Sequence, residues 1–277
     1  MTEQALIFTD LDGTLLDHHT YSHEAALPML GVIKNAHIPI IPTTSKTYAE
    51  LKVLRQQIEL NGPFIIENGA AVYIPQYLFR EAPALTKLID GYWVRQFTAP
   101  RHHWLKLLEQ LEDDFAGCFE HFSSMSIAQI CAATGLKSVD AKRAAQRQYG
   151  EPILWLGDEK TKQIFIRQLK THGAQPLQGG RFIHLSGECN KGTALNWLVA
   201  EYKLQHPSLN FTSIALGDGE NDVAMLEAAD IAVRILSPIN PLPKVNKIEN
   251  LVTSTLIGPA GWNECLSKIL TQHLEEK

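Results

Sequence analysis

Short apolar runs alternate with amphipathic stretches along the first seventy residues of the chain. The runs have the length and composition of buried strands, and the stretches between them repeat apolar residues with the period of a helix. Five such segments follow one another: 5–9, 22–35, 38–42, 47–60 and 64–66. Ser22 is expected to N-cap the first helix. The order strand, helix, strand, helix, strand predicts a parallel, doubly wound α/β sheet.

The pattern changes between about residues 79 and 182 and then resumes. The middle region has expected strands near 92–97, 152–155 and 182–185 and expected helices near 102–115, 126–133, 138–148 and 161–171. From Lys191 the first pattern returns with a helix at 190–202, strands at 211–216, 231–233 and 251–253, and a last helix from about 261. We therefore predict a discontinuous core domain, residues 1–80 and 187–277, with an α+β domain inserted at 81–186.

Composition and charge narrow the classes of partner. The 277 residues are 45% hydrophobic and 20% charged, with a formal net charge of -5, which argues against a nucleic-acid-binding surface. The four cysteines are scattered and form no Cys-X-X-Cys pair, so we expect free thiols in a reducing cytosol. The sequence has no basic leader and no apolar run long enough for a bilayer, so we expect a cytoplasmic protein with no membrane partner.

Polar side chains suited to phosphate chemistry follow the apolar runs. They are Asp10 and Asp12, then Thr43, Thr44 and Ser45, then Lys191 at the start of a helix, and finally Asp218, Asn221 and Asp222. Parallel strands end at one edge of a sheet, so these groups should converge there. A phosphate dianion repels a carboxylate nucleophile, so we expect Mg²⁺ to bridge them while lysine and hydroxyl groups bind the transferring phosphoryl group.

Each of these residues, taken singly, has an ordinary alternative. Asp10 and Asp12 could form an inert solvated turn, Thr44 could cap the next helix, and Lys191 could lie on an exposed helix face. Their occurrence at successive strand ends favours a shared site over these separate explanations.

Two motifs resemble those of the haloacid-dehalogenase superfamily. Segment 10–15, Asp-Leu-Asp-Gly-Thr-Leu, resembles its first motif, and segment 217–222, Gly-Asp-Gly-Glu-Asn-Asp, resembles its acidic fourth motif. The second match and the large insertion resemble the sugar-phosphatase branch, which has a Rossmann-like core and a C2-type cap domain. The resemblance implies that Asp10 is the nucleophile and Asp12 the general acid/base.

The same resemblance implies how phosphate and metal would be held. Thr44 and Lys191 would bind the phosphate, with Thr43 left open as an alternative to Thr44. Magnesium would be held by Asp10, the Asp12 carbonyl and Asp218, with Asn221 or Asp222 ordering the outer shell. The branch often has Thr-Gly-Arg in its second motif, where this chain has Thr44-Ser45-Lys46.

Five further segments resemble mannosyl-3-phosphoglycerate phosphatases: 42–47, 66–71, 147–152, 180–184 and 258–264. The reaction implied is Mg²⁺-dependent hydrolysis of mannosyl-3-phosphoglycerate, a small phosphorylated sugar-glycerate, to mannosylglycerate and phosphate. Mannosylglycerate is a compatible solute. The expected substrate-binding residues are Thr43, Ser45, Lys46 and Asn68 in the core and Arg143, Arg147 and Glu151 in the insertion. Arg143 could instead lie on a solvated helix face.

Other functions stay open at this point. A phosphatase of glucosyl-3-phosphoglycerate or of general sugar phosphates would use the same core. A phosphomannomutase-like phosphotransferase would share core and cap but retain the phosphoryl group. A non-catalytic binding module is disfavoured because both aspartates of the first motif are present. The sequence does not indicate an oligomeric state.

Overall fold

The computed structural model describes residues 2–179, 181–247 and 249–275, and the chain forms two compact units. The first unit comprises Met1–Ser45, Ile58–Arg95 and Asn190–Lys277, and the second comprises Lys46–Gln57 and Gln96–Cys189. This division places residues 81–95 with the first unit and most of helix α2 (Tyr48–Ile58) with the second. The domain boundaries at 80/81 and 186/187 and the role of the insertion stay predictions.

The first unit is built on a five-stranded sheet in the order β13-β12-β11-β1-β2. Its strands are β1 (Thr2–Thr9), β2 (Ile40–Pro42), β11 (Leu209–Gly217), β12 (Ile231–Leu236) and β13 (Leu251–Ile257). Every neighbouring pair is parallel. This arrangement confirms the predicted parallel α/β core. The strand order reverses at β1, where ligand sites of such sheets are found.

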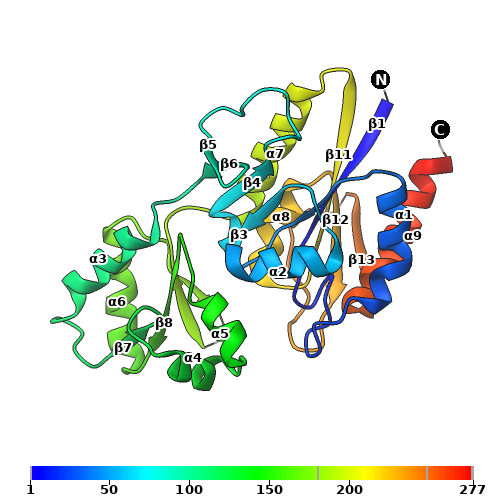
Figure 1. The fold of residues 1–277 in the computed structure, drawn as a ribbon. Helices are drawn as coiled ribbons and strands as arrows, with labels where there is room; N and C mark the ends of the chain where they lie inside the picture. Colours follow the sequence, from blue (N-terminus) through cyan, green and yellow to red (C-terminus); the bar gives the residue numbers. More distant parts are fainter. Residues whose placement is uncertain (1, 180, 248, 276–277) are drawn as a thin grey trace. The chain divides into compact units, whose positions relative to one another are not determined.

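Helices cover both faces of this sheet (Figure 1). Helices α1 (Leu27–Asn35) and α9 (Gly258–Glu275) pack together on one face, and α7 (Lys191–Gln205) and α8 (Val223–Ala228) pack together on the other. Leu6, Ile7 and Phe8 of β1 are therefore all fully buried. A parallel strand covered on both faces reads as a continuous apolar run, which is why β1 was recognisable in the sequence.

Helix α1 begins later than predicted. Ser22 is not its N-cap, because a 3₁₀ turn, η1 (Glu24–Ala26), comes first and α1 follows with Pro28 in its first turn. Proline is favoured there, since its missing N–H is not needed at a helix start and its φ is already helical. The prediction that Ser22 caps the first helix was therefore wrong, because η1 stands between Ser22 and α1.

The third predicted strand, β3 (Phe64–Ile66), does not join the parallel ladder. An isolated parallel bridge joins Ile65 to Thr43, just past the end of β2, but β3 belongs to a separate antiparallel sheet. That sheet has the order β3-β4-β6-β5, with β4 (Ala71–Pro75), β5 (Lys87–Ile89) and β6 (Tyr92–Gln96). The connection from β3 to β4 is the short 3₁₀ turn η2 (Glu67–Gly69). So short a connection can only make an antiparallel pair.

The second unit contains a four-stranded antiparallel sheet in the order β7-β8-β10-β9. The strands are β7 (Phe119–His121), β8 (Glu151–Trp155), β9 (Leu177–Gly179) and β10 (Phe182–Leu185). Helices α3 (Arg101–Leu111) and α6 (Glu159–Thr171) pack on one face, and α4 (Ile127–Thr134) and α5 (Ser138–Ala144) on the other.

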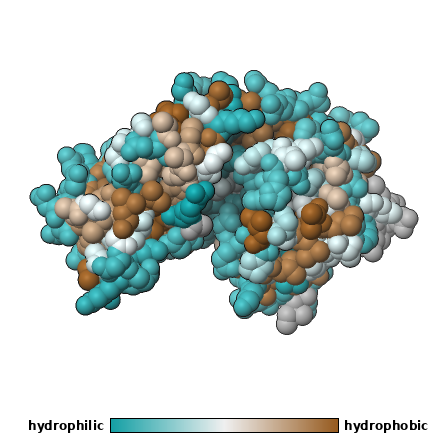
Figure 2. Space-filling model, turned by 90° about the horizontal axis from the view of Figure 1, so that it is seen from below, coloured by the Kyte–Doolittle hydropathy of each residue, from teal (hydrophilic) through white to brown (hydrophobic). Residues whose placement is uncertain are grey.

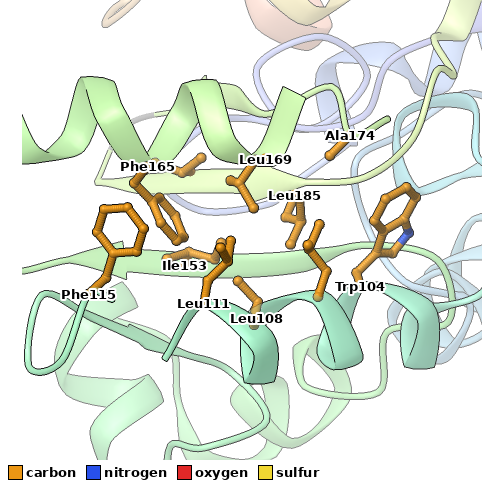
Figure 3. Close-up of a cluster of buried hydrophobic side chains, with 11 residues drawn as sticks. Trp104, Leu108, Leu111, Phe115, Ile153, Phe165, Leu169, Ala174 and Leu185 are labelled. Atoms are coloured by element: carbon orange, nitrogen blue, oxygen red, sulfur yellow. The ribbon is translucent and has the colours of Figure 1, made fainter. Parts of the chain in front are cut away.

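The two faces of this sheet are set by alternating residues. In Figure 3, Leu108 of α3 and Phe165 of α6 converge on Ile153 and Leu185 of the strands. Phe182, with the opposite orientation, packs with buried residues of α4 and α5. The period of two along the strands thus gives this unit a core on each side of its sheet.

The surface shown in Figure 2 mixes residue types, with hydrophobic residues standing between hydrophilic ones and not in one continuous band. Scattered apolar residues of this kind are normal on globular proteins. Within the described ranges, every helix is too short or too polar to span a lipid bilayer.

Candidate active site

Strand register brings the predicted site residues to one edge of the parallel sheet. Thr9, the last residue of β1, pairs with Leu216 of β11. The Asp10 N–H donates to the Leu216 carbonyl at 2.9 Å, and the Thr43 N–H donates to the Thr9 carbonyl at 2.8 Å. The residues just past β1, β2 and β11 are therefore neighbours, as their positions at strand ends predict. Asp218 follows directly after β11.

Lys191 lies at the centre of this edge and is fully buried. Its ammonium donates to Asp10 Oδ1 at 2.7 Å and to Asp222 Oδ1 at 2.6 Å. It is the first residue of α7, whose N-cap Asn190 accepts from the Thr193 N–H at 2.8 Å. Burial alone would lower the pKa of Lys191, but the two carboxylates outweigh it and raise the pKa above its usual range. The lysine is therefore a fixed positive charge beside Asp10.

Asp222 is held in place by the backbone as well as by the lysine. Its Oδ2 accepts from the N–H groups of Asp218 and Gly219 at 3.1 and 3.0 Å. These bonds form around η3 (Glu220–Asp222), the 3₁₀ turn that follows β11. One carboxylate thus orders the acidic loop and orients Lys191 at the same time.

Asp218 is anchored by residues that sequence reasoning missed. Thr14 donates its hydroxyl to Asp218 Oδ1 at 3.2 Å, and the Asn240 amide donates to Oδ2 at 3.1 Å. Burial and the neighbouring Asp222 raise the pKa of Asp218, while side-chain hydrogen bonds with Ser237, Asn240 and Thr14 oppose the rise. Asn240 follows the end of β12, so the rule that selected the other site residues could also have selected it.

Three of the carboxylates form a candidate metal site. Oxygens of Asp10, Asp218 and Asp222 lie within 4.8 Å of one another, and no other such group occurs in the part of the chain that is described. With one ammonium from Lys191, three ionised carboxylates leave an excess of two negative charges. Burial raises the pKa of Asp10 to about 8 against the opposing effect of Lys191, and the charges of Asp222 and Asp12 add to the rise. A hard divalent cation with oxygen ligands, as expected for Mg²⁺, fits this charge and donor set.

The two candidate phosphate-binding threonines differ in their bonds. Both are buried. The Thr43 hydroxyl donates to the Ile41 carbonyl of its own strand at 3.2 Å. The Thr44 backbone is bonded on both sides, from its N–H to Ile65 at 3.0 Å and from the Asn68 N–H to its carbonyl at 2.9 Å. These bonds do not decide which of the two threonines binds phosphate.

A turn of unusual backbone geometry borders the site. Glu67, Asn68 and Gly69 all have positive φ, at 47°, 59° and 92°. A Cβ on Gly69 would lie 2.1 Å from the Asn190 carbonyl oxygen, so this turn presses against the start of α7. The Asn221 amide donates to Asn68 Oδ1 at 3.2 Å, which joins two residues that were predicted separately. Position 69 requires a positive φ and leaves no room for a Cβ beside Asn190, and only glycine meets both requirements.

The remaining predicted residues lie outside this cluster. Ser45 is half-buried at the end of a segment of the first unit, and Lys46 belongs to the second. Arg143 donates to Asp140 at 3.1 Å along one helix, with both side chains partly exposed. These observations test none of the three as substrate ligands.

Arg147 and Glu151, also in the second unit, have contrasting surroundings. Arg147 is half-buried, and its charge adds to the effect of burial in lowering the pKa of His184 to about 4. Glu151 is fully buried, and donors already occupy both of its carboxylate oxygens. That enclosure does not fit direct contact of Glu151 with a substrate.

Comparison with known proteins places this geometry in a family. The family model of haloacid dehalogenase-like hydrolases matches residues 7–87 and 154–248. The glucosyl-3-phosphoglycerate/mannosyl-3-phosphoglycerate phosphatase of Methanococcoides burtonii is 34% identical over 96% of this chain and 97% of the relative. The protein of the same name from Persephonella marina is 31% identical over 96% and 97%.

Solved structures share the fold. The sucrose-phosphatase of Synechocystis superposes over 97% of this chain and 98% of its own, with a TM-score of 0.60 and 14% identity. At that identity the likeness concerns the fold alone. The chain therefore belongs to the haloacid dehalogenase-like hydrolases and is an enzyme that hydrolyses phosphoric monoesters.

Proposed function

We propose that this enzyme hydrolyses mannosyl-3-phosphoglycerate and glucosyl-3-phosphoglycerate to the glycosylglycerate and inorganic phosphate. The observation that carries the proposal is the extent of the match. The two relatives named for these substrates align over 96% of the chain, so the likeness includes the second unit as well as the sheet with the buried aspartates. A family likeness confined to the core would support only a phosphatase of unspecified substrate.

In the proposed reaction, a carboxylate oxygen of Asp10 attacks the phosphorus atom. The bond from phosphorus to the ester oxygen breaks, and Asp12 donates a proton to the departing oxygen. Water then attacks the aspartyl phosphate while Asp12 accepts its proton, which releases phosphate and restores the Asp10 carboxylate. The position of Asp10, 2.7 Å from the buried ammonium of Lys191, supports its role because the nucleophile is held in one orientation.

The other residues of the cluster would bind and neutralise the phosphoryl group. Lys191, fixed by Asp222, offers a permanent positive charge, and Thr44 offers a hydroxyl at the adjacent strand end. Asp10, the Asp12 carbonyl and Asp218 would hold Mg²⁺, which when bound supplies charge neutralisation and polarises the phosphoryl oxygens.

Specificity for the glycosyl and glycerate parts is proposed to come from the inserted domain. Arg143 and Arg147 are its candidate cations for the glycerate carboxylate, and Lys46 and Asn68 are candidates outside it. Arginine suits this task because its planar fork binds carboxylates in a bidentate manner.

The test is phosphate release in the presence of Mg²⁺ from a substrate panel. The panel contains both glycosyl-3-phosphoglycerates, 3-phosphoglycerate, hexose phosphates and a small aryl phosphate, with Asp10→Asn protein as the negative control. We expect the highest kcat/KM for one of the glycosyl-3-phosphoglycerates. Equal or faster hydrolysis of hexose phosphates would contradict the proposal. Interconversion of hexose 1- and 6-phosphates without phosphate release would point to a phosphotransferase.

A further inference from the structure

We infer that Glu151 is a positioning residue that acts through Arg101 to fix the loop carrying Arg147. The effect on substrate specificity rests on the proposed function, whereas the effect on the loop does not. The inference replaces the expectation that Glu151 binds the substrate itself.

Glu151 is enclosed by donors from two other parts of the second unit. Its Oε1 accepts from His121 Nδ1 at 2.9 Å and from the Ser123 N–H at 2.7 Å, and its Oε2 accepts from Arg101 Nε. Burial opposes ionisation, but these bonds outweigh it and lower the pKa of Glu151 below its usual range. The group is therefore a buried carboxylate, fixed at both oxygens and 0% exposed.

Arg101 extends this anchorage to the segment that precedes β8. Its Nη1 donates to the Ala145 carbonyl at 2.9 Å, and its backbone N–H donates to the Gln148 carbonyl at 2.7 Å. Arg101 thus binds two carbonyls of the segment 145–148, and Glu151 binds the side chain of Arg101. Arg147 lies between the two carbonyls.

The guanidinium of Arg101 is suited to this double task. Its planar fork can donate from Nε to one group and from Nη1 to another in a fixed relative geometry, which a lysine ammonium cannot reproduce. Breaking a buried pair by removing one charge leaves the other uncompensated, so the fork would shift when Glu151 loses its charge. A shift of the segment 145–148 would move the backbone of Arg147 with it.

The matched variants are Glu151→Gln, Arg101→Lys and, as a control, Glu109→Gln. Glu109 is an exposed carboxylate on α3 of the same unit. Amide hydrogen exchange of residues 145–150 reports on the loop without any substrate. We expect faster exchange there in Glu151→Gln and Arg101→Lys and unchanged exchange in Glu109→Gln.

Kinetics then test the consequence for specificity. In Glu151→Gln we expect KM for the preferred glycosyl-3-phosphoglycerate to rise about tenfold, with kcat/KM for a small aryl phosphate within about twofold of wild type. Arg101→Lys should likewise raise KM for the glycosyl-3-phosphoglycerate and leave kcat/KM for the aryl phosphate nearly unchanged. This variant carries the test if Glu151→Gln does not fold. Should the wild-type enzyme prefer another sugar phosphate, the proposed function fails and the same comparison is made with that ester.

A double-mutant cycle separates positioning from direct contact. If Glu151 acts through Arg147, the Arg147→Ala/Glu151→Gln protein should have the KM of Arg147→Ala within about twofold. If the rise in KM of the double variant equals the product of the rises in the two single variants, the inference is overturned, because Glu151 would then contact the substrate itself. Wild-type loop exchange and wild-type KM in folded Glu151→Gln would overturn it as well.

Discussion

Replacing Asp10 with asparagine separates the chemical role proposed for this carboxylate from its electrostatic effect on the fold. Asp10 lies 2.7 Å from the Lys191 ammonium, and its oxygen lies within 4.8 Å of oxygens of Asp218 and Asp222. With an effective dielectric constant of about 20, the attraction is about 6 kcal/mol and each repulsion is at least about 3.5 kcal/mol. The two repulsions therefore offset the attraction, and the cost of burying the Asp10 charge has no compensation in the absence of a cation.

Two results follow from this balance for Asp10→Asn. Phosphate release should fall at least about a thousandfold, because the amide cannot act as the nucleophile. Without divalent cations, the free energy of unfolding should be higher than that of wild type by about 1–3 kcal/mol. The folded wild-type protein must either bury the Asp10 charge or take up a proton there, since its pKa rises to about 8, and the neutral amide avoids both costs. Mg²⁺ should stabilise the wild-type protein by mass action and the variant less.

The assay is urea unfolding in EDTA and in Mg²⁺, with phosphate release measured on the same preparations. Asp113→Asn serves as the control, because Asp113 is exposed. Retained turnover in Asp10→Asn would remove Asp10 as the nucleophile. A variant clearly less stable than wild type in EDTA would refute the reasoning about excess negative charge.

Three further perturbations test the site and the second unit. Gly69→Ala should lower the free energy of unfolding by about 2–4 kcal/mol in urea, because its Cβ would overlap the Asn190 carbonyl. Asn240→Ala should weaken Mg²⁺ binding about tenfold in a titration followed by activity, since Asp218 loses a 3.1 Å hydrogen bond. The pKa of Glu151 is lowered from its usual 4.5, so its stabilisation is present above pH 4.5 and is lost as pH falls through the lower folded value. Urea unfolding from pH 7 to 3 should show this loss in wild type and not in Glu151→Gln.

The chain's apolar periodicity was sufficient to predict the parallel sheet and the convergence of Asp10, Lys191 and Asp218. Buried parallel strands are continuous apolar runs, so their ends are visible in the sequence. The antiparallel pairing of β3 was not predicted, because it depends on a three-residue turn at Glu67–Gly69 with positive φ at each position. Asn240 was missed for a simpler reason, since it lies farther past its predicted run, 231–233, than Asn221 and Asp222 lie past theirs, 211–216.

Burial and pairing of charges are the part that local pattern could not supply. Lys191 reads as an ordinary first residue of a helix, yet it is fully buried. Its burial was not predictable from local pattern, because the partners that bind its charge lie 181 and 31 residues away in the chain. Glu151 reads as a polar residue at the start of a strand, and its partners Arg101 and His121 lie 50 and 30 residues away. A charge enters a protein interior only with such partners. The sequence can therefore indicate which residues have the chemistry of a site, whereas the tertiary pairing decides which of them face a ligand and which hold the others in place.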